Sequence, residues 1–118
     1  LAPTLLLIWQ VVSTLLQLGS FVDEPDGRGM TTLMAVTEIG HMQLIPLLLE
    51  SKANLNKSNH QFQTALHLAV EKGQMEAVEM LSREGADVCA VNHRGWTPLI
   101  VACRADLHEI GRVLVQAP

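Results

Sequence analysis

The chain has 118 residues, a formal net charge of -4 and a hydrophobic content of 48%. This length suits one domain rather than two, and the apolar content is enough to fill a continuous core. Aromatic residues make up only 3% and tyrosine is absent, so the core must be aliphatic. The eight lysines and arginines are scattered, which argues against the clustered basic surface that nucleic-acid binding requires.

The first segment, residues 1–22, contains no Asp, Glu, Lys or Arg. As a helix it would carry one narrow polar stripe in an otherwise apolar surface, formed by Gln10, Ser13, Thr14 and Gln17. A membrane span is disfavoured because the apolar run is short and interrupted, against the roughly 20 residues needed. A signal peptide is disfavoured because no basic region precedes it. Two interpretations stay open: a cap on the next element, or an interface with a second copy or another domain.

The rest of the chain repeats itself at a fixed interval. Thr31, Thr64 and Thr97 are evenly spaced, since 64 − 31 = 97 − 64 = 33. The same interval relates two sets of leucines, which are Leu33, Leu66 and Leu99, and Leu15, Leu48, Leu81 and Leu114. Self-similarity at such a period is the signature of a repeat architecture.

Each unit reads as a pair of short helices. The threonine is a typical N-cap, and Pro98 suits a first helical position. A helix of small residues follows and a glycine ends it, as Gly73 does in the middle unit. A second helix with an apolar stripe comes next, and a polar, turn-rich linker such as "NKSNHQFQ" or "CAVNHRGW" completes the unit. Two short helices cannot bury their own apolar faces, so neighbouring units must cover each other.

The residues of these units resemble the ankyrin repeat family. The stretches that carry the resemblance are "MTTLMAVTEIGHMQLIPLLLESKANLN" at 30–56, "TALHLAVEKGQMEAVEMLSREGADV" at 64–88 and "GWTPLIVAC" at 95–103. They compare with the family pattern G-x-T-P-L-H-x-A-A-x-x-G-H-x-E-V-V-x-L-L-L-x-x-G-A-D-V-N. The resemblance implies an all-α solenoid of stacked antiparallel helix pairs, joined by β-hairpin-like loops that we call fingers.

We expect a single ankyrin repeat domain over residues 1–118. The sequence divides it into a partial N-terminal repeat or capping helix at 1–28, repeats at 29–61 and 62–94, and a truncated repeat at 95–118. The first residue is Leu1 rather than Met, which suggests a piece of a longer protein.

Several residues depart from the family pattern. Phe62 replaces the finger glycine that Gly29 and Gly95 supply in the other repeats, and a phenylalanine is strained at positive φ. Asp106 and Lys52 replace glycines that end helices. Pro46 lies early in a second helix and is expected to bend or shorten that helix.

We find no catalytic or metal-binding constellation and predict neither enzyme activity nor a cofactor. By resemblance, His67 forms a structural hydrogen bond with Thr64, and His41 is structural too. His60 and His93 lie in the fingers and are expected to face solvent. They are not expected to bind a metal ion, because no Cys/His pairing has the spacing of a metal site. Of the two cysteines, Cys103 falls at a small-residue position of the interior and is expected in the core, and Cys89 lies in a loop.

The function implied by the resemblance is non-enzymatic binding of a partner protein or peptide through the fingers and the concave helix face. Trp96 and Arg94 rank first as contacts, although Trp96 could instead pack along its own finger. Met30 and Met34 either form an adaptable apolar patch or cover the edge of the core. The candidate residues are Arg28, Met30, Met34, Glu38, His60, Gln61, Phe62, Glu71, Lys72, His93, Arg94, Trp96 and Arg104.

Two alternatives remain: a regulatory or substrate-adaptor segment of a larger enzyme, and a scaffold that self-associates through residues 1–22. The low cysteine content favours a reducing, intracellular setting, in the cytoplasm or nucleus. We expect no nucleic-acid partner and no membrane span.

Overall fold

The computed structural model describes residues 25–40, 42–50 and 52–116. Within these ranges it contains six helices and no strand. The helices are α2 (Thr32–Ile39), α3 (Leu44–Glu50), α4 (Ala65–Glu71), α5 (Met75–Arg83), α6 (Pro98–Arg104) and α7 (His108–Gln116). The apolar segment 1–22, with its expected cap or interface, lies outside the described residues, as does His41.

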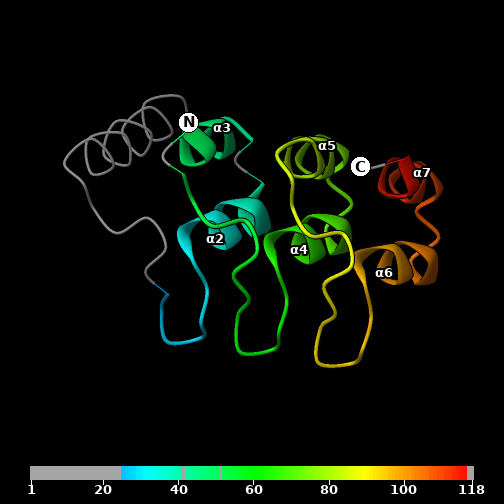
Figure 1. Ribbon diagram of the computed structural model, residues 1–118, viewed down its shortest axis with the longest axis horizontal. Helices are drawn as coiled ribbons and strands as arrows, with labels where there is room; N and C mark the ends of the chain where they lie inside the picture. The colour runs from blue at the N-terminus through cyan, green and yellow to red at the C-terminus, as the bar shows by residue number, and fades with distance from the viewer. Residues whose placement is uncertain (1–24, 41, 51, 117–118) are drawn as a thin grey trace.

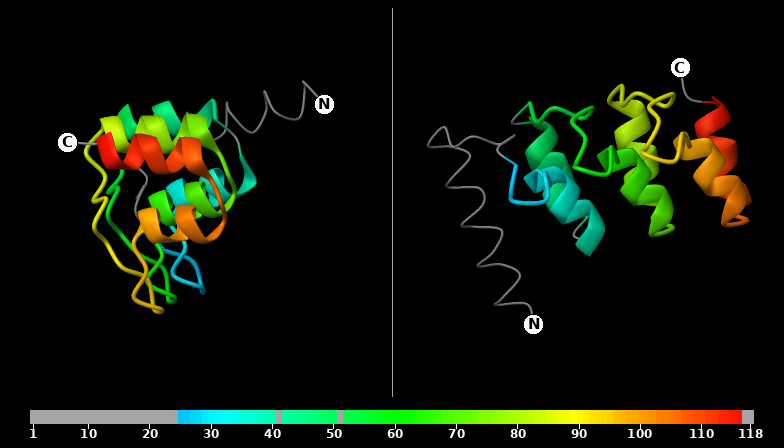
Figure 2. Two further views of the ribbon diagram at one scale, coloured as in Figure 1. Left: turned by 90° about the vertical axis from the view of Figure 1, so that its right-hand side faces the viewer. Right: turned by 90° about the horizontal axis from the view of Figure 1, so that it is seen from below.

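The helices stack in two layers, as the sequence predicts for an all-α ankyrin solenoid. The first helices of the pairs, α2, α4 and α6, form one row, and the second helices, α3, α5 and α7, form the other (Figure 1). Three long fingers extend from the row of first helices and lie side by side (Figures 1 and 2). Seen end on, fingers and helices therefore enclose an angle, and the inside of that angle is the concave face (Figure 2).

Threonine caps fix where the first helices begin. The hydroxyls of Thr31, Thr64 and Thr97 each accept a hydrogen bond from the backbone N–H three residues later, at 3.4, 3.4 and 3.3 Å. Each cap residue has an extended backbone, as an N-cap requires. Pro98 follows the third cap at the first helical position, where its missing N–H would have had no partner. The predicted caps are confirmed.

The second helix that contains Pro46 is shortened, also as predicted. Helices α5 and α7 each have nine residues, whereas α3 has seven and begins at Leu44. A helix starting at Met42, the position equivalent to the first residue of α5, would need the absent Pro46 N–H to bond the Met42 carbonyl, and the ring would clash with that carbonyl. Starting at Leu44 instead places the proline in the first turn, where no such bond is needed.

One continuous core runs between the two layers, and equivalent leucines build it. Leu33 and Leu66 are 1% and 0% exposed, and Leu48, Leu81 and Leu114 are 0%, 0% and 5% exposed. Burying a leucine of this kind contributes about 1.5–3 kcal/mol relative to leaving it in water. The interval of 33 residues thus marks the positions that meet in the interior.

All three residues that replace family glycines take the glycine conformation. Lys52, Phe62 and Asp106 have φ angles of 64, 61 and 63°. A residue with a Cβ loses roughly 1–2 kcal/mol in this left-handed region. The backbone of the repeat therefore overrides the local preference of these side chains.

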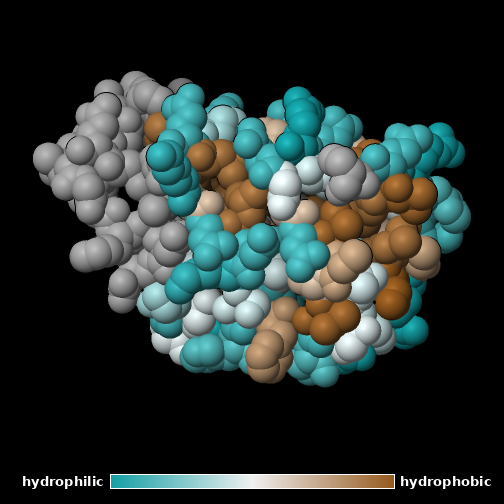
Figure 3. All heavy atoms as spheres, in the orientation of Figure 1, coloured by the Kyte–Doolittle hydropathy of each residue, from teal (hydrophilic) through white to brown (hydrophobic). Residues whose placement is uncertain are grey.

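The C-terminal end of the core is open among the described residues. Cys103 is exposed, which corrects the expectation that it is a core residue. Its equivalent in α4, Val70, is fully buried because α6 packs beside α4. No further described helix covers α6 on its other side, and Figure 3 shows apolar residues gathered on the surface over α6 and α7.

Candidate functional site

The fingers owe their shape to one acidic or amide side chain each. Oδ1 of Asp26 accepts hydrogen bonds from the backbone N–H groups two and four residues later, at 2.8 and 2.9 Å. Asn59 does the same at 2.9 and 3.0 Å, and Asn92 at 2.9 and 3.1 Å. Such side-chain bonds to following N–H groups are typical of Asx turns. The N–H groups of Met30 and Arg28 also lower the pKa of the Asp26 carboxyl.

Neighbouring fingers are joined by backbone hydrogen bonds. The N–H of His60 donates to the Arg28 carbonyl at 3.1 Å, and that of His93 donates to the Gln61 carbonyl at 3.0 Å. Both imidazole rings are exposed, as expected. Two equivalent bonds thus hold the three fingers at a fixed spacing, so the surface they present is formed before any partner arrives.

His67 connects the middle helix pair to the third finger. The backbone N–H of Thr64 donates to His67 Nδ1 at 3.2 Å, which assigns the ring proton to Nε2. Nε2 in turn donates to the Trp96 carbonyl at 2.9 Å. Burial lowers the pKa of His67, whereas the bond to Trp96 opposes that shift. The predicted hydrogen bond to Thr64 is confirmed, whereas the hydrogen bond to Trp96 was not predicted from the sequence.

A groove of about 540 Å³ lies between the second and third fingers and the ends of the first helices. Its lining residues are Glu38, Gln61, Gln63, Leu68, Glu71, Asn92, His93, Arg94, Trp96, Val101, Arg104 and Ala105. A smaller hollow of about 280 Å³ continues it toward the first finger and shares Glu38, Gln61 and Gln63. The two hollows together form one concave surface across three repeats.

Trp96 holds two arginines at the C-terminal end of this groove. The guanidinium carbons of Arg104 and Arg94 lie 4.3 and 5.1 Å from the centre of the indole ring. At these distances each cation is attracted to the aromatic face, by about 0.5–1 kcal/mol at an exposed site. Among the described residues neither guanidinium forms an ion pair. Their N–H groups are therefore available to an anion.

The middle of the groove is acidic, and its carboxylate is held in place. Nε2 of Gln63 donates to Oε2 of Glu71 at 3.0 Å, and Oε1 of Gln63 accepts from Asn59 Nδ2 at 3.1 Å. This chain of bonds fixes the Glu71 carboxylate against the second finger. Glu38 occupies the equivalent position in the preceding helix and is half-buried.

The comparison with family models decides the class of protein. The family described as ankyrin repeats, in three copies, matches residues 8–92 and 63–118. The chain belongs to the ankyrin repeat family. No curated protein matches its sequence. Ankyrin repeats are generally protein–protein interaction modules, and the groove lies on the concave side of this ankyrin stack.

The structure separates the predicted contact residues into two groups. Met30 and Met34 are 5% and 1% exposed, so the interpretation in which they cover the core edge holds and the apolar patch does not form. The ankyrin fold places all the other candidates at or near the surface. They are Arg28, Glu38, His60, Gln61, Phe62, Glu71, Lys72, His93, Arg94, Trp96 and Arg104. Phe62 is 60% exposed but does not line the groove.

The structural roles of Asp26, Asn59, Asn92 and Gln63 were not predicted from the sequence. The first three shape the finger turns through their side chains. Their spacing of 33 residues and the known preference of Asp and Asn for turns carried the signal. The bond from Gln63 to Glu71 gave no signal in the sequence, because it depends on the distance between a finger and a helix end.

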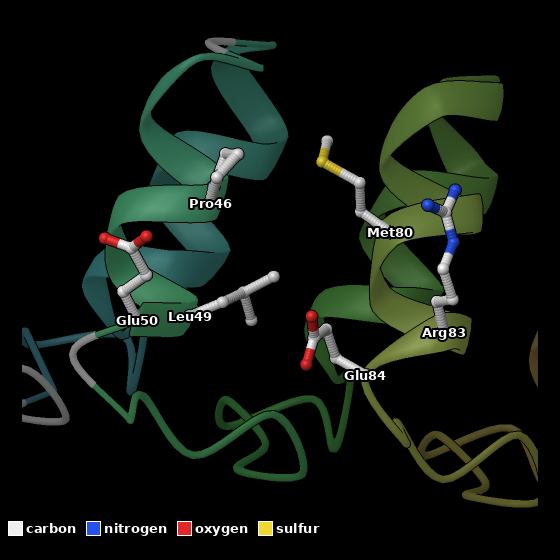
Figure 4. A pocket seen from close by; sticks show the side chains of 6 residues that line it. All are labelled: Pro46, Leu49, Glu50, Met80, Arg83 and Glu84. Atoms are coloured by element: carbon white, nitrogen blue, oxygen red, sulfur yellow. The ribbon is translucent and has the colours of Figure 1, made fainter.

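A second hollow lies on the opposite, convex side, between α3 and α5. Pro46 and Leu49 of α3 and Met80 of α5 point into it, whereas Glu50 is directed away (Figure 4). At about 340 Å³ it is smaller than the main groove, and its lining contains no aromatic residue. We therefore take the concave groove as the candidate site of this ankyrin domain.

The described residues contain no group of three or more His, Cys, Asp or Glu side chains placed to hold a metal ion. None of their helices is long and apolar enough to cross a membrane.

Proposed function

We propose that the chain binds a segment of a partner protein in the concave groove and has no catalytic activity of its own. The observation that carries this proposal is the cluster of Arg94, Trp96 and Arg104 in that groove. Tryptophan and arginine are the residue types most enriched among interface hot spots. Both arginines also keep donors available for a partner.

The proposed mechanism is rigid presentation. The finger turns, the bonds between fingers and the His67 link fix the backbone of the site before binding. A surface that is already ordered loses little conformational entropy on docking, so more of its contact energy appears as affinity. A flexible loop with the same side chains would bind more weakly.

A protein or peptide fits this surface better than a nucleic acid does. The groove mixes the acidic Glu38 and Glu71 with the basic Arg94 and Arg104, and a phosphate backbone would be repelled by the first pair. We propose an intracellular partner, consistent with the low cysteine content of the chain.

The test is affinity purification of partners from a cell lysate with three proteins: wild type, the double variant Arg94→Ala/Trp96→Ala, and the control Arg83→Ala. Arg83 is an exposed arginine on the convex side. Proteins retained by wild type and control should be lost from the double variant, while the helical circular-dichroism signal of all three stays the same. Retention of the same proteins by the double variant would dismiss the groove as the binding surface.

A further inference from the structure

The concave groove carries an ordered pattern of charge along the stack. Glu38, Glu71 and Arg104 are each the seventh residue of their helices α2, α4 and α6. All three line the groove. One position of the repeat thus presents an acid, a second acid and then a base, in the order of the repeats.

The spacing of these charges follows from helix packing. Helices α2 and α4 pack side by side, as do α4 and α6. Packed helix axes lie about 8–10 Å apart. A peptide in the extended polyproline II conformation rises about 3.1 Å per residue and has three residues per turn, so one turn covers about one repeat. Every third side chain lies on the same side of such a peptide and would therefore meet the next charge.

At the basic end, the two arginines favour an anion more than a single arginine would. Both guanidinium carbons lie within 5.1 Å of the centre of the Trp96 ring, so two positive charges sit at the same end of the groove. A carboxylate placed beside this ring is attracted by both and can accept charge-assisted hydrogen bonds. At the acidic end, the bond from Gln63 occupies only Oε2 of Glu71, and Oε1 stays available to a cation.

From this pattern we infer that the preferred ligand is a peptide in the extended polyproline II conformation with two basic side chains and one acidic side chain, each three residues apart. Its order is basic-x-x-basic-x-x-acidic, or the reverse if the peptide runs the other way. The basic side chains lie against Glu38 and Glu71, and the carboxylate lies against Arg94 and Arg104. This inference rests on the proposed function and specifies the chemistry of the partner.

The experiment is a selection of random linear peptides displayed on phage, using the wild-type domain as bait. The enriched peptides should share the three-charge pattern, and replacing any one charge by Ala should weaken binding about five-fold in fluorescence anisotropy. Binding should also weaken as salt is added.

A charge swap makes the assignment specific. The variant Arg104→Glu should select peptides in which a basic side chain replaces the acidic one. The variant Arg83→Glu makes the same charge change on the convex side and should select the wild-type pattern. Circular dichroism confirms that both variants remain folded.

The results of the selection distinguish failure of this inference from failure of the proposed function. Peptides that lose binding with Trp96→Ala but carry no charge order would overturn the inference and leave the groove as a binding site. A selection that enriches no peptide, or only peptides whose binding is unchanged by Trp96→Ala, would overturn the proposal that the groove is a binding site. The inference would fall with it.

Discussion

The helix pair α4–α5 and the pair α6–α7 follow the same sequence pattern but differ in burial. In the middle pair, Leu66 and Val70 are fully buried between neighbours on both sides. In the last pair, the equivalent Leu99 is half-buried and Cys103 is exposed. Because the pattern is shared, the difference comes from the neighbours alone. The burial of these two positions therefore depends on whether a following pair covers them.

The largest expected effect is on the two equivalent leucines. Leu66→Ala removes a side chain with 0% exposure and should lower the free energy of unfolding by about 2–5 kcal/mol. Leu99→Ala should cost roughly 1–2 kcal/mol, because less of that side chain is removed from water. Urea denaturation followed by circular dichroism measures both. Equal losses would mean that α6 is covered in solution by something outside the described residues.

A smaller effect is expected at His67, whose equivalents Met34 and Ile100 lack the hydrogen bonds. His67→Ala removes a cap interaction and leaves the Trp96 carbonyl without its donor, at a cost of about 1–3 kcal/mol. His60→Ala, which removes an exposed ring, should change stability by less than about 0.5 kcal/mol.

The contribution of His67 should also depend on pH. Its pKa in the folded protein lies below 6.5, so between these two values the unfolded chain binds more protons than the folded one. The stabilisation by His67 is thus complete above pH 6.5 and is lost as the pH falls through that window. The stability difference between wild type and His67→Ala, measured by urea denaturation at several pH values, should shrink as the pH is lowered. A constant difference would contradict the neutral, hydrogen-bonded ring.

The smallest effect concerns the fingers, where Phe62 occupies a position that Gly95 fills in the next repeat. Phe62→Gly should raise the free energy of unfolding by about 0.5–1 kcal/mol. Glycine removes the strain at a φ of 61°, and part of that gain is offset because glycine has more conformational entropy in the unfolded chain. Gly95→Ala is the reverse test. A Cβ at this position meets no atom within 4 Å, so any loss of stability comes from backbone strain alone. Destabilisation by Phe62→Gly would show that packing of the ring outweighs the strain.

Much of the fold could be read from particular residues. The threonines at 31, 64 and 97 predicted the helix starts, and Pro46 predicted the short α3, because caps and proline act through atoms near in sequence. The site was only partly predictable. Trp96 and Arg94 were expected as contacts, but the approach of Arg104 to the same ring depends on how a finger lies against a helix end.

The sequence by itself determined the repeat, its period and the positions that face the interior, since these follow from local hydrogen bonding and from the periodicity of apolar side chains. Tertiary structure decided which of those positions are covered, as Val70 and Cys103 show, and which charges share a groove. The physical reason is that burial and charge proximity are properties of pairs of elements. A chain specifies such pairs only once its repeats are stacked.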